Sequence, residues 1–224
     1  MKNTEDRSGA KPAIKIIDKK KFYEGTIYRS NKGDLFQITD YNGCMKVTAK
    51  FLDAGSAYVT TTLQNINNGQ VKNPCHPNAY GGYLGMGYYS EHPDKSIYNI
   101  WIGIFNRSTD KIHIDSIVDP SWYNYNTFCE WYVPYLKSLP EGEYAIDKDL
   151  LFNRYYQSTG GQKCYSPNTC VLVPQDMERQ LINIRMNNIT GPNPCDICDL
   201  ASLYLQEGKI TKLVYDSIME NYKK

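Results

Sequence analysis

The sequence predicts an α+β fold with a small N-terminal antiparallel β module, a central ββα-type domain with flanking helices, and a C-terminal helical hairpin. Short runs of β-branched and aromatic residues alternate with turn residues over 22–71. Apolar residues recur at helical spacing from Ile97 to Phe105, and again in two segments after the breaker Gly191–Pro194. The predicted divisions are a mobile basic arm (1–21), the β module (22–74), the central domain (75–190) and the hairpin (191–224).

The first two divisions follow from charge and from turn residues. The arm is rich in charge and ends in Lys19-Lys20-Lys21. Asn42-Gly43 predicts a type I′ hairpin turn inside the β module, because both residue types accept positive φ angles. The expected strands are Thr26–Tyr28, Leu35–Ile38, Lys46–Phe51 and Tyr58–Thr60.

The central domain is expected to begin near two prolines, Pro74 and Pro77, which are followed by a glycine-rich segment at 81–87. The segment lacks the preceding apolar strand and the following Lys-Ser/Thr of a nucleotide-binding loop, so it is interpreted as a connector. Asp94 or Ser96 is expected to cap a helix. A second helix should start after Asn126 or Thr127 and kink or end at Pro134, and the two helices should share a core.

The ββα unit is predicted from the order of the segments that follow. An acidic strand or loop at 144–151 precedes a turn at 165–170, a short strand at Val171–Val173 and a helix from about Gln175 to Asn187. The hairpin helices are expected at Asp199–Gln206 and Ile210–Tyr222, with the turn at Glu207-Gly208.

Composition limits the function classes. The chain is 41% hydrophobic and has 25 Lys+Arg against 24 Asp+Glu, so it should fold and any basic surface must be local. We expect a cytoplasmic protein without membrane contact, because no apolar signal segment or membrane-length run is found. The odd number of cysteines, 7, favours reduced thiols or metal ligands over disulfides.

Five segments follow one another in a characteristic order: Tyr98–Arg107, Tyr125–Trp131, Ile146–Leu150, Cys164–Cys170 and Val173-Pro174-Gln175. In order and spacing they resemble a small HNH-like, homing-endonuclease-like protein family of bacteriophages. The resemblance covers roughly residues 22–222 and is strongest over 144–178. It implies an enzyme of the host-cell cytoplasm that cuts double-stranded DNA with Mg²⁺ or Mn²⁺.

The resemblance also implies a site in which an Asp-His pair supplies a metal ligand and a general base. An Asn orients the base, and a helix residue completes the metal site, because a cation must stabilise the scissile phosphate while the base activates water. Asp147 matches the metal ligand, Lys148 the base, Asn168 or Thr169 the orienting residue, and Glu178 the helix ligand. Three of these four positions depart from the family pattern.

Lys148 is the departure that bears most on activity. An ordinary lysine, with a pKa of about 10.4, is protonated at pH 7 and is no base. Asp149 is then the candidate for a water-activating or supporting carboxylate, and Asp147, Asp149 and Glu178 are hard donors that suit Mg²⁺. The alternative interpretation is a solvated turn at 147–149 and an exposed Glu178.

Four cysteines are candidates for a structural zinc site. Cys195 and Cys198 form a C-x₂-C pair, and Cys164 and Cys170 form a pair of looser spacing. Thiols without a metal are the alternative.

DNA contacts are expected from cationic side chains of the central domain, with scattered surface charge as the alternative. They are Arg107, Lys148, Arg154, Lys163, Arg179 and Arg185.

Two functions follow from these observations. The first is a metal-dependent DNA endonuclease, whose nicking of duplex DNA should disappear in Asp147→Ala. The second is a catalytically inactive relative that acts as a nucleic-acid-binding or protein-interaction module of a phage. A virion-associated or host-defence-countering protein that works by interaction alone is a third alternative.

Overall fold

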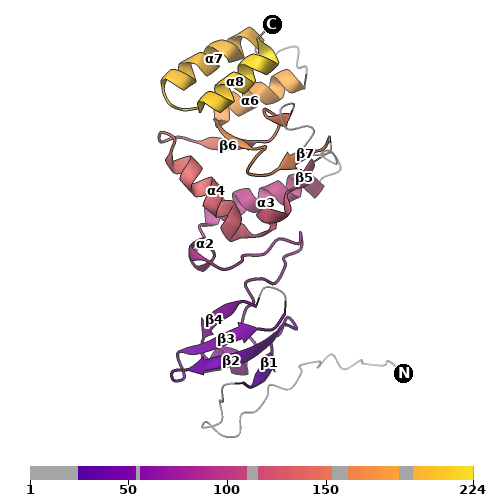
Figure 1. Cartoon of the computed structure of the whole chain (residues 1–224), viewed down its shortest axis with the longest axis vertical. Coiled ribbons are helices and arrows are strands. Elements are labelled where there is room, and N and C mark those ends of the chain that lie inside the picture. Colours follow the sequence, from indigo (N-terminus) through magenta and orange to yellow (C-terminus); the bar gives the residue numbers. More distant parts are fainter. Residues whose placement is uncertain (1–24, 54–55, 110–115, 153–160, 187–193, 224) are drawn as a thin grey trace, which may run out of the picture. The chain divides into compact units, whose positions relative to one another are not determined.

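A computed structural model describes residues 25–53, 56–109, 116–152, 161–186 and 194–223. The chain divides into two compact units (Figure 1). Unit 1 consists of Met1–Asn78 and Tyr83–Met86, and unit 2 of Ala79–Gly82 and Gly87–Lys224. The predicted arm at 1–21 lies outside the described residues.

Unit 1 is a four-stranded antiparallel sheet in the order β1-β2-β3-β4. Alternate residues of β2 and β3, such as Phe36, Ile38 and Val47, are fully buried, because successive side chains of a strand point to opposite faces. A short helix, α1 (Leu63–Asn67), follows the last strand. The strands are β1 (Ile27–Arg29), β2 (Leu35–Tyr41), β3 (Val47–Phe51) and β4 (Tyr58–Thr61), close to the four that were predicted.

The turn between β2 and β3 differs from the predicted type I′ hairpin. That turn requires positive φ at both central residues, whereas here Gly43 has a φ of 91° and Asn42 is not among the residues with positive φ. The backbone N–H of Asn42 donates to the carbonyl of Lys46, which closes a longer loop.

The chain after α1 is tied to unit 1 through a buried aspartate, Asp34. His76 Nδ1 lies 2.9 Å from Asp34 Oδ1, and Asn73 Nδ2 donates to the same oxygen over 3.3 Å. Ser30 Oγ donates to the other oxygen over 3.0 Å. These contacts explain why unit 1 extends to Asn78, beyond the boundary predicted after residue 74.

Unit 2 begins with an aromatic core built on α3 (Lys95–Thr109) and α4 (Tyr125–Lys137). The ring centroids of Trp101 and Tyr125, one from each helix, lie 5.4 Å apart. The predicted shared core of these helices is therefore confirmed. The short helices α2 (Tyr88–Glu91) and η1 (Pro120–Tyr123) were not predicted.

The ends of these two helices follow local chemistry. Asp94 caps α3, since its Oδ1 accepts the backbone N–H groups of Ser96 at 2.7 Å and Ile97 at 3.1 Å. Pro134 lies inside α4, which continues to Lys137. The proline removes one backbone donor without ending the helix.

Two pairs of strands lie between the α3/α4 layer and the C-terminal helices (Figure 1). β5 (Ser116–Val118) pairs in parallel with β7 (Lys163–Tyr165), and neither strand was predicted. β6 (Tyr144–Asp147) pairs antiparallel with β8 (Val171–Pro174), with Asp147 opposite Val171. β8 leads directly into α6 (Gln175–Arg185), so β6, β8 and α6 form the predicted ββα order.

The C-terminal hairpin consists of α7 (Pro194–Gln206) and α8 (Lys212–Tyr222). α7 begins five residues earlier than predicted, because proline fits the first turn of a helix, where its missing N–H is not needed. Ile197 of α7 and Val214 of α8 share a core with Met177 of α6. The hairpin is therefore part of unit 2 and not a separate division.

The α+β class is thus confirmed. Among the described residues, no helix combines the length and apolar character that crossing a bilayer requires.

Candidate functional site

The site predicted from the sequence centres on Asp147, at the end of β6. Its side chain is fully buried. Oδ1 accepts the backbone N–H groups of Asp149 at 2.6 Å and Leu150 at 2.8 Å, which fixes the turn after the strand. Oδ2 accepts a hydrogen bond from Arg185 Nη2 at 2.7 Å. Both oxygens of Asp147 therefore have partners within the chain.

Arg185 comes from the last turn of α6 and contacts several groups. Besides Asp147, its Nη1 lies 3.6 Å from Asp149 Oδ2, and its Nε donates to the Tyr222 hydroxyl over 3.3 Å. Burial lowers the pKa of Arg185, but its interactions with Asp147, Tyr222 and Asp149 together raise the pKa above its ordinary value. The guanidinium is a permanent cation between the two aspartates.

Glu178, the predicted helix ligand, meets Asp147 from α6. Burial raises the pKa of Glu178 to about 10, and the charge of Asp147 and a hydrogen bond between the two carboxyl groups add to the effect. Its Oε2 is buried and has no hydrogen-bond partner among the described atoms. Glu178 is therefore neutral at pH 7 and not the exposed residue of the alternative interpretation.

Asp149 lies among cations. Lys148 Nζ donates to its Oδ1 and Oδ2 at 3.0 and 3.1 Å, and Lys163 Nζ lies 3.0 Å from Oδ1. Burial alone would raise the pKa of Asp149, but Lys148, Arg185 and Lys163 together lower it. Asp149 is thus an ionised partner of three cations.

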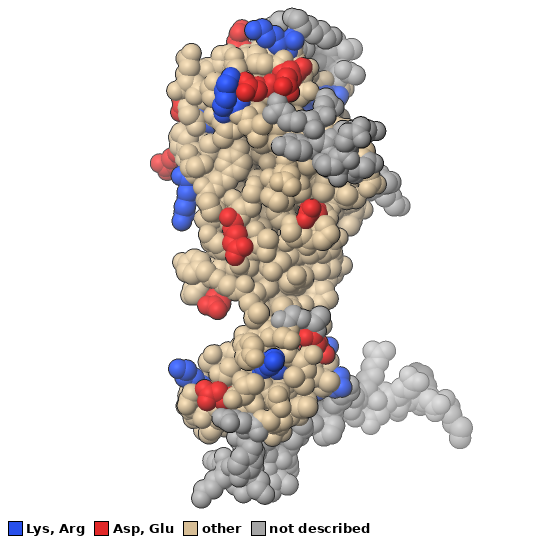
Figure 2. All heavy atoms as spheres, in the orientation of Figure 1, with Lys and Arg blue, Asp and Glu red and all other residues tan. Residues whose placement is uncertain are grey.

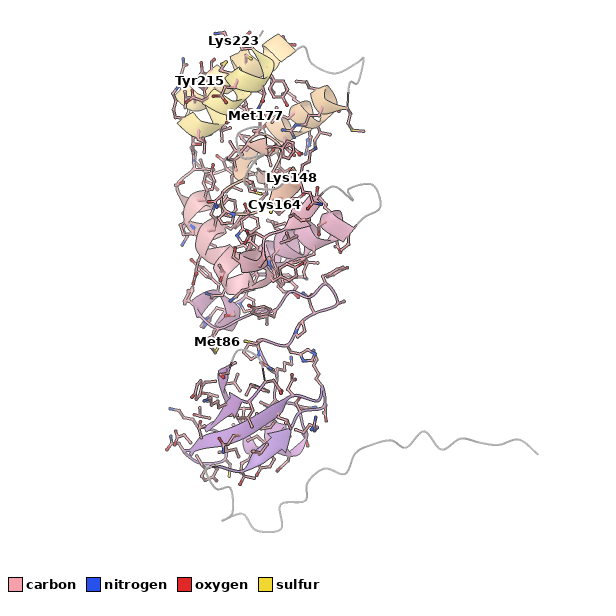
Figure 3. All side chains as sticks on the ribbon, turned by 45° about the vertical axis from the view of Figure 1, so that its right-hand side comes forward. Met86, Lys148, Cys164, Met177, Tyr215 and Lys223 are labelled. Carbon is pink, nitrogen blue, oxygen red and sulfur yellow. The ribbon has the colours of Figure 1, made fainter. Side chains whose placement is uncertain are left out.

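Lys148, at the position of the base, is buried in the strand layer of unit 2 (Figure 3). Its ammonium group donates to both oxygens of Asp149 and lies 5.6 Å from the centroid of the Tyr165 ring. Donating to a carboxylate and facing an aromatic ring are contacts of a protonated amine. Lys148 is arranged as a cation and not as a general base.

Tyr165 joins Arg107 to this group. Arg107 Nε, at the end of α3, donates to the Tyr165 hydroxyl over 3.0 Å. Burial raises the pKa of Tyr165, although Arg107 opposes the shift. We call the connected residues the charged network; they are Arg107, Asp147, Lys148, Asp149, Lys163, Tyr165, Glu178 and Arg185.

The charged network does not fit a divalent cation as it stands. Asp147 has no oxygen without a partner, Asp149 already pairs with three cations, and Glu178 is protonated. Over the described residues, no three His, Cys, Asp or Glu side chains gather where they would hold a metal ion. The three predicted ligands do converge, but on Arg185.

The predicted zinc ligands are in different surroundings. Cys164 and Cys170 are neighbours at the turn, with Cys170 Sγ 4.0 Å from the Cys164 carbonyl oxygen, and burial raises the pKa of both thiols. Cys198 is buried in the core of the C-terminal helices, and the side chain of Cys195 lies outside the described residues.

The remaining predicted residues lie apart from the network. Asn168 is exposed in the turn, where its backbone N–H donates to Ser166 Oγ over 3.3 Å. Arg179 Nη2 donates to Gln175 Oε1 over 3.4 Å on the exposed face of α6. Arg154 lies outside the described residues.

Sequence reasoning missed the role of Arg185, which was predicted only as a DNA contact. The sequence did contain a signal for this role. Glu178 and Arg185 are seven residues, or about two turns, apart in a predicted helix, so Arg185 lies on the same face as the predicted ligand.

Comparison with known proteins adds no family: no family model, no curated protein and no solved structure matches this chain. The resemblance to the HNH-like phage family accordingly stays a prediction.

Proposed function

We propose that this protein binds the phosphate backbone of double-stranded DNA through the charged network and does not hydrolyse it. The observation that carries the proposal is the excess of positive charge in that network. Four cationic side chains, those of Arg107, Lys148, Lys163 and Arg185, are combined with two ionised carboxylates. Local positive charge of this kind attracts phosphate even in a chain of almost zero net charge.

Two of these cations are at least partly exposed. Lys163 and Tyr165 are two residues apart in β7 and so lie on one face of the strand. Arg107 is exposed and holds the Tyr165 hydroxyl, and the Lys163 side chain is 34% exposed. We infer that Arg107 and Lys163 contact phosphate together.

The surface argues for few contacts and weak binding. Over unit 2, the face drawn in Figure 2 is largely uncharged and carries isolated acidic side chains and a few groups in which acidic and basic side chains are adjacent. A patch of two cations fits non-specific affinity, on the order of 10⁻⁴–10⁻⁶ M at physiological salt. The absence of hydrolysis is supported by Lys148, which stands at the base position as a cation.

The test measures the binding of a labelled DNA duplex by fluorescence anisotropy over a range of salt concentrations. Lys163→Gln should weaken binding and lower the slope of log affinity against log salt by about 0.9, the value for one phosphate contact. Lys212→Gln is the matched control, because it removes one lysine that is 69% exposed and already pairs with a carboxylate, Asp216. Equal losses in both variants, or no binding by the natural protein, would overturn the proposal.

The endonuclease predicted from the sequence is the second candidate. One observation favours it: the carboxyl groups of Asp147 and Glu178, the two predicted ligands from β6 and α6, interact closely enough to raise the pKa of Glu178. A supercoiled plasmid incubated with Mg²⁺ or Mn²⁺ distinguishes the two candidates. Intact plasmid supports binding without hydrolysis, whereas nicking that disappears in Asp147→Ala supports the endonuclease.

A further inference from the structure

Two of the three predicted metal ligands, Asp147 and Asp149, pair with a cation that belongs to the chain itself. Arg185 Nη2 lies 2.7 Å from Asp147 Oδ2, and Nη1 lies 3.6 Å from Asp149 Oδ2. Glu178 is on the same helix, and its carboxyl group interacts with both Asp147 and Arg185. One guanidinium thus bridges a strand end, the following turn and a helix.

We propose that the Arg185 guanidinium takes the place of a divalent cation among these carboxylates and closes the site to metal ions. A guanidinium is planar, permanently charged and able to donate to two carboxylates at once, so it satisfies the same acidic groups that would otherwise hold a hard cation. The proposal gives Arg185 a function distinct from the DNA contact predicted for it.

Two contacts from α8 hold this arrangement in place. The Tyr222 hydroxyl accepts a hydrogen bond from Arg185 Nε over 3.3 Å, which fixes the guanidinium at its third nitrogen. Asn221 Nδ2 donates to the Leu150 carbonyl over 3.1 Å and so fixes the turn that follows Asp147. Both the arginine and the aspartates it bridges are therefore positioned by neighbouring residues of one helix.

The position of the charges explains why an added ion would not displace the arginine. The Asp147 side chain is fully buried, whereas that of Arg185 is 22% exposed. A metal ion entering beside Asp147 would have to move a cation that three partners hold, or stand next to it. Like charges at short distance in a partly buried site repel strongly.

The experiment titrates Mn²⁺ into the purified full-length chain and follows the electron paramagnetic resonance signal of the free ion. The natural protein and Asp147→Asn should give the same titration curve, because neither of them binds Mn²⁺ at residue 147. Arg185→Met, which removes the charge and keeps much of the side-chain length, should gain one Mn²⁺ site per chain. The double variant Arg185→Met/Asp147→Asn should lose that site again.

Arg179→Met is the matched control, because Arg179 lies on the same helix and is exposed. It should bind no more Mn²⁺ than the natural protein. Circular dichroism, recorded with and without Mn²⁺, checks the fold of each variant. Should Arg185→Met unfold without the ion, recovery of its helical signal on addition of Mn²⁺ supports the proposal equally.

Three results would overturn the proposal. They are a Mn²⁺ site in the natural protein that Asp147→Asn removes, a folded Arg185→Met that gains no site, and an Arg185→Met that stays unfolded with the ion. No nucleic acid is present in this experiment, so its outcome is independent of whether the chain binds DNA.

Discussion

Unit 1 and unit 2 each bury an aspartate whose two oxygens both have partners, but the partners differ in kind. Asp34 of unit 1 interacts with side chains of Ser30, Asn73 and His76. Asp147 of unit 2 interacts with two backbone N–H groups and with Arg185. A histidine is charged only when protonated, whereas an arginine is charged at every pH that proteins experience.

The difference has an energetic consequence. Asp34 is held by several hydrogen bonds, each of modest net value, so the loss of one leaves the others. Asp147 depends on a single opposite charge in buried surroundings, and the loss of that charge leaves an uncompensated carboxylate. We therefore expect substitutions around Asp147 to have much larger effects than substitutions around Asp34.

The largest expected effect is that of Arg185→Met on the free energy of unfolding. The variant removes the only charged partner of Asp147 in the described structure, so unit 2 should lose about 3–5 kcal/mol. Urea unfolding followed by circular dichroism without added metal measures the loss. Arg179→Met, on the exposed face of the same helix, should change the value by less than about 0.5 kcal/mol. Similar losses in both variants would show that Asp147 does not depend on Arg185.

A second effect, smaller than that of Arg185→Met at pH 5 and dependent on pH, is expected for Glu178→Gln. The pKa of Glu178 is raised to about 10, so the folded state retains a proton that the unfolded chain releases near the ordinary value. The stabilising contribution of the neutral carboxyl is complete below the unfolded pKa and is lost as the pH rises towards the folded pKa.

Relative to Glu178→Gln, the natural protein should therefore lose stability above about pH 4.5, at up to about 1.4 kcal/mol per pH unit. Urea midpoints at pH 5, 7 and 9 measure the difference. Glu141→Gln is a suitable control, because it makes the same change at an exposed residue outside the network. Parallel pH curves for the natural protein and Glu178→Gln would contradict the retained proton.

The smallest effect is expected for His76→Ala in unit 1. Asp34 keeps its hydrogen bonds from Ser30 and Asn73, so the local loss should be about 0.5–1.5 kcal/mol. Hydrogen exchange of the backbone amides of Ser30 and Asp34 in the full-length chain reports it, while the amides of α8 should be unaffected. A loss as large as that of Arg185→Met would remove the contrast between the two aspartates.

Some elements could be predicted because their signals are local. The four strands of unit 1 follow from alternating apolar residues between turn residues, and the cap of α3 from Asp94 at the start of an apolar period. β5 and β7 could not be predicted in this way. Each has three residues, and their pairing joins positions more than 40 residues apart, which no local pattern encodes.

Part of the candidate site could also be predicted. The order of segments placed Asp147 and Glu178 in neighbouring elements, because β8 pairs with β6 and leads directly into α6. The partners of these carboxyls were missed. A carboxylate can bind a metal ion, a backbone N–H group or an arginine side chain. The residue type alone does not say which of these partners it has in the folded protein.

The sequence by itself determined the α+β class, the ββα order and the set of ionisable residues near the turn after β6. Apolar periodicity, helix caps and turn residues act over a few positions, so they can be recognised in a single sequence. Only the tertiary structure decided that Arg185, 38 residues beyond Asp147, provides the cation for the carboxylates. The reason is that burial makes charge pairing obligatory, but the fold alone selects which charges meet.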